Sequence, residues 1–304
     1  RLKAAKYVTL TSTKGIFQLD STSYTGIEAQ KVIVVSAETV DLQGAGNQFG
    51  TLTVQSADTS TPLQGSVLVK DNADKLILSV QPVVNGDITV ENTKNQGVIQ
   101  VTSELKTYAD EMVHEDGNIT LKSDGSMQID KAIAANLNVD LTSINGAMTI
   151  GGDVSASTGT ITLQSDGDMQ TTGKLTAGAD VNVTSVTGDV TTNGAVSAEG
   201  NVALLSSEGA ITTINTVTAV AGDIEVTAKG NMETRGTVRA GGNVALLSTE
   251  HAITVNDTVT AVAGNINATA QGDVTTGAKL SAEQGAITIT SVEGTVAIGK
   301  EVKA

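Results

Sequence analysis

The residues of this chain that could carry catalytic or metal chemistry are few. There is no cysteine, and the two histidines, His114 and His251, lie far apart in the sequence. The best aligned acidic pair is Asp168 and Asp189, which occupy equivalent places in successive repeats. Two carboxylates could hold a cation through oxygen ligands. No third ligand accompanies them, so we favour solvated corner residues and predict neither a metal nor another cofactor.

Arginines and carboxylates could also indicate a polysaccharide-cleaving enzyme, because many such enzymes are solenoids with clustered acids, calcium and an arginine base. Here Arg235 and Arg239 are close together, but the acidic residues are scattered at one or two per repeat. The sequence contains no GxSxG, HExxH, Walker, dinucleotide-binding or calcium-nonapeptide motif. We therefore predict that the protein is not an enzyme, and we keep a β-helix polysaccharide lyase or hydrolase as the alternative.

Threonines suggest a third and less favoured function. Thr171, Thr192, Thr234 and Thr276 each follow an aliphatic residue or methionine by two positions. If they face outward, such an array could order water, as in ice-binding solenoids. The array is interrupted in the repeats of Ile211 and Ile253, and outward threonine is common in strands.

The elements that would position these residues belong to a repeat of 20 to 22 residues, which begins with the pattern G-[N/D/T/A]-[I/V]. The first aliphatic residue of each repeat is one of Ile119, Val139, Ile161, Val181, Val202, Ile224, Val244, Ile266 and Ile287. A second apolar residue follows at an offset of 8 or 9: Met127, Met148, Met169, Val190, Ile211, Met232, Ile253, Val274 and Val296. A third follows at 14 or 15: Ile133, Val154, Leu175, Val196, Val217, Val238, Val259, Leu280 and Val302.

Three apolar positions per short repeat favour three short strands per coil. Parallel pairing would place each strand about 4.8 Å from its equivalent in the next coil. Each coil then buries its apolar side only against its neighbours, and the connections should be right-handed. The sequence therefore predicts an all-β, right-handed parallel β-helix in which all 27 of these positions point inward. Residues 242–283 match residues 200–241 at 24 of 42 positions, which indicates a tandem copy of two coils.

Glycines punctuate the repeat two positions before most first and second apolar residues. We expect corners with positive φ there, which glycine adopts without strain. His251 replaces glycine at one corner, and histidine tolerates this conformation better than most residues. The residue after the glycine is often Asn or Asp, and stacking would align Asn201, Asp223, Asn243 and Asn265 in a hydrogen-bonded column.

The first part of the chain departs from the strict period. Residues 1–87 contain strand-like runs at uneven spacing, with larger side chains such as Phe17 and Phe49. We predict irregular coils or a cap over 1–87, a coil with an insertion over 88–117, and about nine regular coils over 118–304. Leu105, Tyr108, Met112 and Val113 have helical spacing, which predicts a short lateral helix near 104–113.

Composition excludes several classes of function. The formal net charge of −15 argues against nucleic-acid binding, which needs a basic surface. No apolar run approaches the roughly 20 residues of a membrane helix, so we expect no membrane insertion. The sequence begins at Arg1 without a charged and then apolar leader, so a secretion signal would be removed or lie outside this sequence.

Segments such as GNITLKSDGSMQ and GDVTTNGAVSAEGNVALLS resemble the repeats of filamentous-haemagglutinin-like exoproteins, the large substrates of two-partner secretion. The resemblance covers about residues 117–304. It implies a right-handed parallel β-helix, secreted or at the bacterial cell surface, that serves as an adhesin or as the stalk of a contact-dependent toxin. The partners it implies are an outer-membrane secretion pore and a receptor or glycan on a host or neighbouring cell. The Asn-Pro motifs of the family's export domain are missing, which indicates an internal segment or a relative with a different secretion route.

Overall fold

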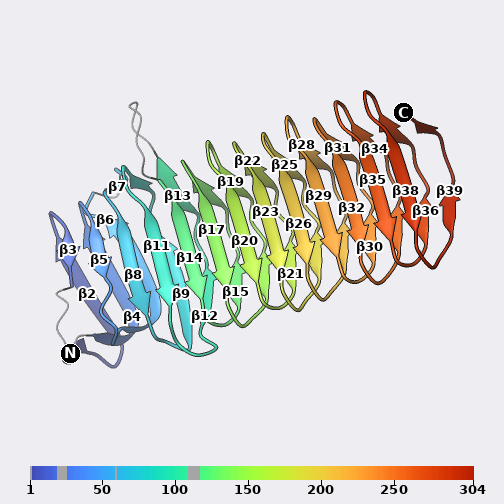
Figure 1. The fold of residues 1–304 in the computed structure, drawn as a ribbon. Coiled ribbons are helices and arrows are strands. Elements are labelled where there is room, and N and C mark those ends of the chain that lie inside the picture. Colours follow the sequence, from blue (N-terminus) through green and yellow to red (C-terminus); the bar gives the residue numbers. More distant parts are fainter. Residues whose placement is uncertain (1, 19–25, 59, 109–116) are drawn as a thin grey trace. The chain divides into compact units, whose positions relative to one another are not determined.

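The structure is a computed structural model that describes residues 2–18, 26–58, 60–108 and 117–304. Every regular element in these ranges is a β-strand, and the strands pair in parallel. The chain forms two compact units, Arg1–Ser157 and Thr158–Ala304. Figure 1 shows short strands stacked coil upon coil in each unit. The predicted all-β parallel β-helix with three strands per coil is confirmed.

In the first unit, three sheets run along the stack of coils. One contains β1, β2, β4, β6, β9, β12, β15 and β18, the second β3, β5, β8, β11, β14 and β17, and the third β7, β10, β13, β16 and β19. The strands are β1 (Leu2–Lys3), β2 (Tyr7–Ser12), β3 (Ile16–Phe17), β4 (Ile27–Ser36), β5 (Val40–Leu42), β6 (Gln48–Ser56), β7 (Leu63–Gln64), β8 (Val67–Asp71), β9 (Lys75–Val80), β10 (Val83–Val84), β11 (Ile88–Asn92), β12 (Val98–Val101), β13 (Leu105–Tyr108), β14 (Ile119–Ser123), β15 (Met127–Ile129), β16 (Ile133–Ala135), β17 (Val139–Ser143), β18 (Met148–Ile150) and β19 (Val154–Ala156).

The second unit is more regular, because each coil has a first strand of five residues followed by two shorter strands. Its 21 strands form seven coils of three. They are β20 (Ile161–Ser165), β21 (Met169–Thr171), β22 (Leu175–Ala177), β23 (Val181–Ser185), β24 (Val190–Thr192), β25 (Val196–Ala198), β26 (Val202–Ser206), β27 (Ile211–Thr213), β28 (Val217–Ala219), β29 (Ile224–Ala228), β30 (Met232–Thr234), β31 (Val238–Ala240), β32 (Val244–Ser248), β33 (Ile253–Val255), β34 (Val259–Ala261), β35 (Ile266–Ala270), β36 (Val274–Thr276), β37 (Leu280–Ala282), β38 (Ile287–Ser291), β39 (Val296–Ile298) and β40 (Val302–Lys303).

The predicted apolar columns fill the interior. In the first unit Met127 pairs in register with Met148, and in the second Met169 pairs with Val190. Of the 27 predicted positions, 24 are buried. The other three, Ile287, Val296 and Val302, belong to the last coil, where no described strand covers them. Their exposure follows from the need of each coil for a neighbour on both sides.

The residue two positions after each of these apolar residues also points to the interior, because alternate residues of a strand share a face. In the second unit, the third strand of each of the first six coils places a buried alanine there. The fifth residue of the first strand is usually a buried serine. The Ser206 hydroxyl donates to the Gly188 carbonyl of the preceding coil and accepts from the Gly209 N–H of its own. The buried alanines and serines are small, and the serine hydroxyls bind the backbone, so successive coils can pack closely at the sharp corners.

The corner glycines are required for a reason that differs from the prediction. Gly117 has a positive φ of 110°, but neither the other corner glycines named by the pattern nor His251 does. Close approach of successive coils is the actual constraint. A Cβ on Gly209 would lie 2.5 Å from the Gly188 carbonyl oxygen, and one on Gly222 would lie 2.5 Å from the Gly200 oxygen.

The helix predicted over residues 104–113 is wrong for residues 105–108, which form β13. Leu105 and Thr107 are buried, whereas Tyr108 is exposed, so the alternation has a period of two. Pairing of Leu105 with Ile133 places it in the third interior column. Residues 109–113 lie outside the described residues.

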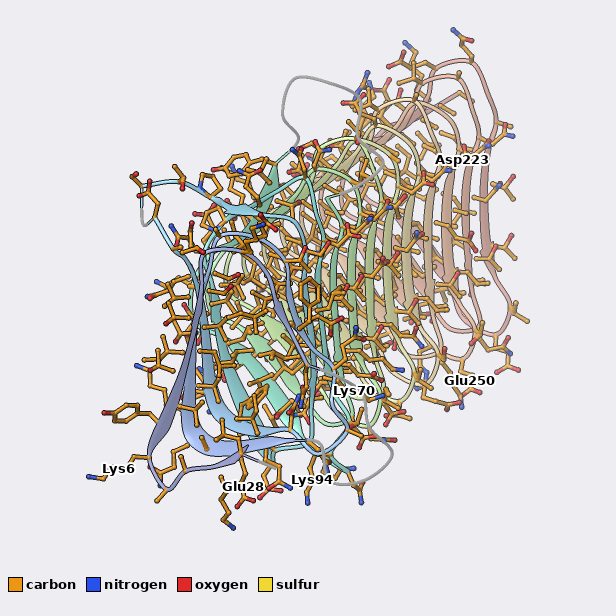
Figure 2. All side chains as sticks on the ribbon, turned by 90° about the vertical axis from the view of Figure 1, so that its left-hand side faces the viewer. Lys6, Glu28, Lys70, Lys94, Asp223 and Glu250 are labelled. Carbon is orange, nitrogen blue, oxygen red and sulfur yellow. The ribbon has the colours of Figure 1, made fainter. Side chains whose placement is uncertain are left out.

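The strand-like runs predicted in residues 1–87 are strands, and the two longest are β4 and β6. Phe49 is fully buried in β6, whereas Phe17 is 64% exposed. Figure 2 shows the charged side chains of Lys70 and Lys94 in the first unit and of Glu250 in the second on the outside of their coils. The core is therefore mainly aliphatic, and these three charged side chains lie on the surface.

Candidate functional site

The predicted acidic pair stacks as expected, but each carboxylate already has a structural partner. Asp168 Oδ1 accepts the backbone N–H of Asp189 at 3.0 Å, and Asp189 Oδ1 accepts that of Ala210 at 2.7 Å. The two carboxylates therefore link successive coils. In the described ranges, no three His, Cys, Asp or Glu side chains are grouped as a metal site would require.

The predicted Asn/Asp column is confirmed at another corner. Asn201 Oδ1 accepts the N–H of Asp223 at 2.9 Å, and Asp223 Oδ1 accepts that of Asn243 at 2.6 Å. Asn243 continues the column to the N–H of Asn265 at 2.8 Å. Corner amides and carboxylates thus satisfy backbone donors that the turns leave unpaired.

The two arginines do not form a site with these acids. Arg235 Nη2 lies 2.9 Å from Glu233 Oε2 in the same coil. The hydrogen bond from Arg235 lowers the pKa of Glu233, and the same contact raises the pKa of Arg235. Arg239 faces outward from β31, paired with Thr218 and Thr260 of the adjacent strands.

The histidines are not brought together by any described contact. His251 lies at a corner, where its N–H donates to the Ser248 hydroxyl. Its Nδ1 is 3.3 Å from the Lys229 carbonyl oxygen. His114 lies outside the described residues.

The threonine array does not face the solvent. Thr171, Thr192, Thr234 and Thr276 are at most 1% exposed. The column also includes Thr213, so it is not interrupted in the coil of Ile211 as predicted; Val255 occupies the position in the coil of Ile253. The five threonine hydroxyls in this column have no hydrogen-bond partner. The prediction that these threonines could form an outward-facing, water-ordering array is therefore wrong.

The first unit contains a buried carboxylate that the sequence patterns did not reveal. Asp71 ends β8, accepts the N–H groups of Phe49 at 2.8 Å and Ala73 at 3.1 Å, and is 1% exposed. Burial raises its pKa to about 6, against the opposing effect of these hydrogen bonds. Asn92, its register partner in β11, donates to the Ala73 carbonyl at 3.0 Å.

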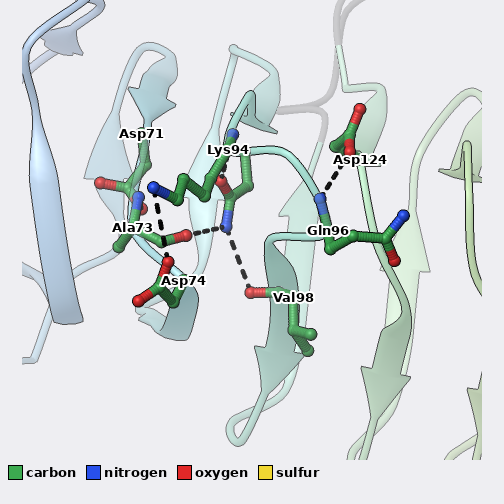
Figure 3. A network of polar contacts seen from close by, with 8 residues as sticks. Asp71, Ala73, Asp74, Lys94, Gln96, Val98 and Asp124 are labelled. Atoms are coloured by element: carbon green, nitrogen blue, oxygen red, sulfur yellow. Dashed lines mark hydrogen bonds and ion pairs between the residues drawn. The ribbon is translucent and has the colours of Figure 1, made fainter.

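Figure 3 shows how this corner continues to the next coils. Lys94 Nζ lies 3.6 Å from Asp74 Oδ1, and Asp124 Oδ2 accepts the N–H of Gln96 at 2.7 Å. Gln96 has a positive φ of 58°. The network has a structural role, because its side chains bind backbone groups and, at Lys94 and Asp74, another side chain of the adjacent coil.

The outer face of the five-residue strands in the second unit is the best candidate for a binding surface. Its residues were not recognised from the sequence, because only inward positions repeat strictly. A depression of about 220 Å³ lies over β23, β26 and β29. Its outward-facing lining residues are Asn182, Thr184, Ala203, Leu205, Glu225 and Thr227.

Polar side chains on this face differ from those at the corners. The side chains of Asn182, Glu225 and Thr227 make no hydrogen bond or ion pair within the described residues. The corner residues Asp189 and Asn201, by contrast, bind the backbone of the next coil. The strand face therefore presents donors and acceptors that are available to a ligand.

No protein-family model, curated protein or solved structure matches this chain. Among the described residues, no helix is long and apolar enough to cross a membrane.

Proposed function

We propose that this protein is a structural segment of a bacterial adhesin, secreted or displayed at the cell surface, that holds a binding or effector region away from the cell. The observation that carries the proposal is the coil-to-coil uniformity of the second unit. The Asn201, Asp223, Asn243 and Asn265 column repeats one hydrogen bond from coil to coil. A scaffold of this kind can be lengthened by copying coils, because each coil contacts only its neighbours.

The tandem copy of two coils supports the same function. Residues 242–283 reproduce 24 of the 42 residues of 200–241, including most of the buried positions. Selection for reach favours such duplication, whereas a single catalytic site would need only one copy. The acidic pair Asp168 and Asp189 is also engaged in stacking. We therefore propose a protein without enzymatic activity, whose partners are a receptor or glycan on another cell and an outer-membrane secretion pore.

Surface labelling of the producing cells tests this function. Antibodies raised against the purified chain should label intact cells, and brief treatment of intact cells with protease should remove the signal. Deleting the gene should lower attachment to host or neighbouring cells, and restoring it should recover attachment. Labelling seen only after the cells are permeabilised would contradict surface display. Normal attachment by the deletion strain would contradict the role in adhesion.

A further inference from the structure

The outer face of the five-residue strands in the second unit carries a pattern that repeats every two coils. Register pairing places five residues in one row across β23, β26, β29, β32 and β35: Asn182, Ala203, Glu225, Ala245 and Asn267. A parallel row, two positions further along the strands, contains Thr184, Leu205, Thr227, Leu247 and Thr269. We call these ten residues the two-coil face.

The two-coil face alternates low and raised positions. Ala203 lines the depression between Asn182 and Glu225 and has the smallest side chain of the three. Ala245 holds the equivalent place between Glu225 and Asn267. Beside the alanines stand Leu205 and Leu247, which are 36% and 37% exposed. Each small residue thus lies next to an aliphatic side chain and between polar ones.

The spacing of the pattern restricts the ligand. Coils stack about 4.8 Å apart, so equivalent groups of the two-coil face recur at about 9.6 Å. An extended peptide strand advances only about 3.3 Å per residue and repeats its side-chain direction at about 6.6 Å. A β-1,4-linked hexopyranose chain turns over at each ring, so its chemical repeat is two rings of comparable length to two coils.

The chemistry of the face matches such a chain. Sugar rings present hydroxyls at their edges and C–H groups on their faces. Asn182, Glu225 and Asn267 offer unpartnered amide and carboxylate groups to the hydroxyls, and Leu205 and Leu247 offer apolar contact to the faces. With a net charge of −15 and Glu225 at its centre, the surface favours an uncharged chain over an anionic one.

We propose that the two-coil face binds an extended, uncharged β-1,4-linked hexopyranose chain that runs along the stack of coils from Asn182 to Asn267. The inference rests on the proposed function in that it names the ligand class of the adhesive segment. Its test uses purified protein, so the result does not depend on where the cell displays the chain.

A repeating proline-rich peptide is the nearest competitor, because a polyproline II helix completes three residues in about 9.3 Å. Domains that bind such helices use grooves lined with aromatic side chains. The two-coil face contains no aromatic residue. The sugar chain is therefore favoured, and a polyproline peptide serves as the comparison ligand.

Isothermal titration calorimetry of the complete chain tests the proposal. The probes are the β-1,4-linked hexamers of glucose and of N-acetylglucosamine, with a polyproline peptide as comparison. At least one sugar hexamer should bind. Substituting both alanines, Ala203→Leu and Ala245→Leu, should weaken that binding by about tenfold or more, since it fills both low positions. Glu225→Gln should weaken it by about tenfold, because a hydrogen bond to a charged acceptor is replaced by a weaker one to a neutral amide.

A matched control places leucines on a different outer face. Ser197→Leu with Ser281→Leu adds two leucines at outward positions of β25 and β37 and should leave binding unchanged. Thermal unfolding of each variant should show that the fold is kept. The proposal is overturned if neither hexamer binds, if only the polyproline peptide binds, or if the alanine and serine pairs of substitutions weaken binding equally.

Discussion

At the residue scale, the most unusual feature is the column of buried threonines in the second unit. Five hydroxyls in this column lack a hydrogen-bond partner. A buried polar group without a partner costs about 1–3 kcal/mol. Val255 occupies one position of the same column without any change of register, so the space accepts a methyl group in place of the hydroxyl.

We therefore expect Thr213→Val to stabilise the protein by about 1 kcal/mol. The matched control is Thr212→Val, which changes the neighbouring outward residue of β27 and should alter stability by less than about 0.5 kcal/mol. Chemical denaturation followed by circular dichroism measures both. A loss of stability in Thr213→Val would show that this hydroxyl has a partner in solution.

Asp71 should make the stability of the first unit depend on pH. Burial raises the pKa of Asp71 to about 6 from an ordinary value of 3.8. Between these values the folded chain binds more protons at this group than the unfolded chain does. The free energy of unfolding should therefore fall as pH rises from about 4 to about 6, by roughly 3 kcal/mol in total, and change little above that range through this group.

Thermal unfolding between pH 4.5 and 7.5 measures this effect, and Asp71→Asn provides the comparison because it cannot ionise. As the pH rises through 6, the unfolding midpoint of the wild type should fall relative to that of the variant. A constant difference across this range would show that Asp71 titrates normally.

Residue-scale features were the least predictable from the sequence. The inward anchors were predicted because their apolar types recur, but the second inward residue in the second strand of each coil varies among threonine, isoleucine and valine. The strand rule that residues i and i+2 share a face would have placed Thr171 and its equivalents inside. The buried Asp71 has Asn92 and Ser123 at the equivalent places of the next two coils, so no single residue type recurs there from which its burial could be predicted.

At the element scale, the corners are held by two devices, side chains that bind the next coil and glycines that let coils approach. Asp189 shows how the two combine, because its Oδ1 binds Ala210 and would lie 2.5 Å from a Cβ on Gly209. Sequence patterns identified the glycine positions, but they could not distinguish a need for positive φ from a need for space. Only the distances between coils separate the two.

Substitutions of two corner glycines test this explanation. Gly209→Ala should destabilise the second unit by about 1–3 kcal/mol, because the added methyl group overlaps the preceding coil. Gly277→Ala should be neutral or slightly stabilising, since its Cβ would meet only the Val255 carbonyl oxygen at 3.5 Å and its φ is not positive. Equal effects of the two substitutions in denaturation experiments would contradict the role of close approach.

The helix predicted near 104–113 shows how element prediction fails at an irregular coil. Leu105 and Tyr108 are three residues apart, which fits a helix, but Leu105 and Thr107 are both buried in a strand. A short apolar segment fits both periods. The equivalent strand of the next coil, β16, indicates the correct structure, because β13 pairs with it in register and is therefore also a strand.

At the scale of the whole molecule, repetition made the fold predictable. Three apolar positions per repeat define three strands, and stacking is the only way for such short coils to bury them. The function is harder to predict from the sequence, because outward residues are free to vary once the interior is fixed. The pattern of the two-coil face can be recognised only from the register of the paired strands, which aligns Asn182, Ala203 and Glu225.

The tandem copy gives a further test of modular construction. Deleting residues 200–241 joins Glu199 directly to Gly242, which begins an equivalent coil. The shortened protein should fold with the same circular dichroism per residue and a lower unfolding temperature, because stability in repeat proteins is close to a sum over coils and interfaces. Loss of the β-sheet signal would contradict independent coils.

The central claim is that successive repeats of the second unit stack as parallel coils at one constant spacing. The chain contains no cysteine, so pairs of spin labels can be introduced cleanly. Gln170, Thr254 and Thr275 face outward at equivalent places in β21, β33 and β36. Pulsed electron–electron double resonance measures the distance between the two labels of each double variant. The distance between Gln170→Cys and Thr275→Cys should exceed the distance between Gln170→Cys and Thr254→Cys by about 4.8 Å. Equal distances, or an increment well above this spacing, would contradict the stacked-coil account.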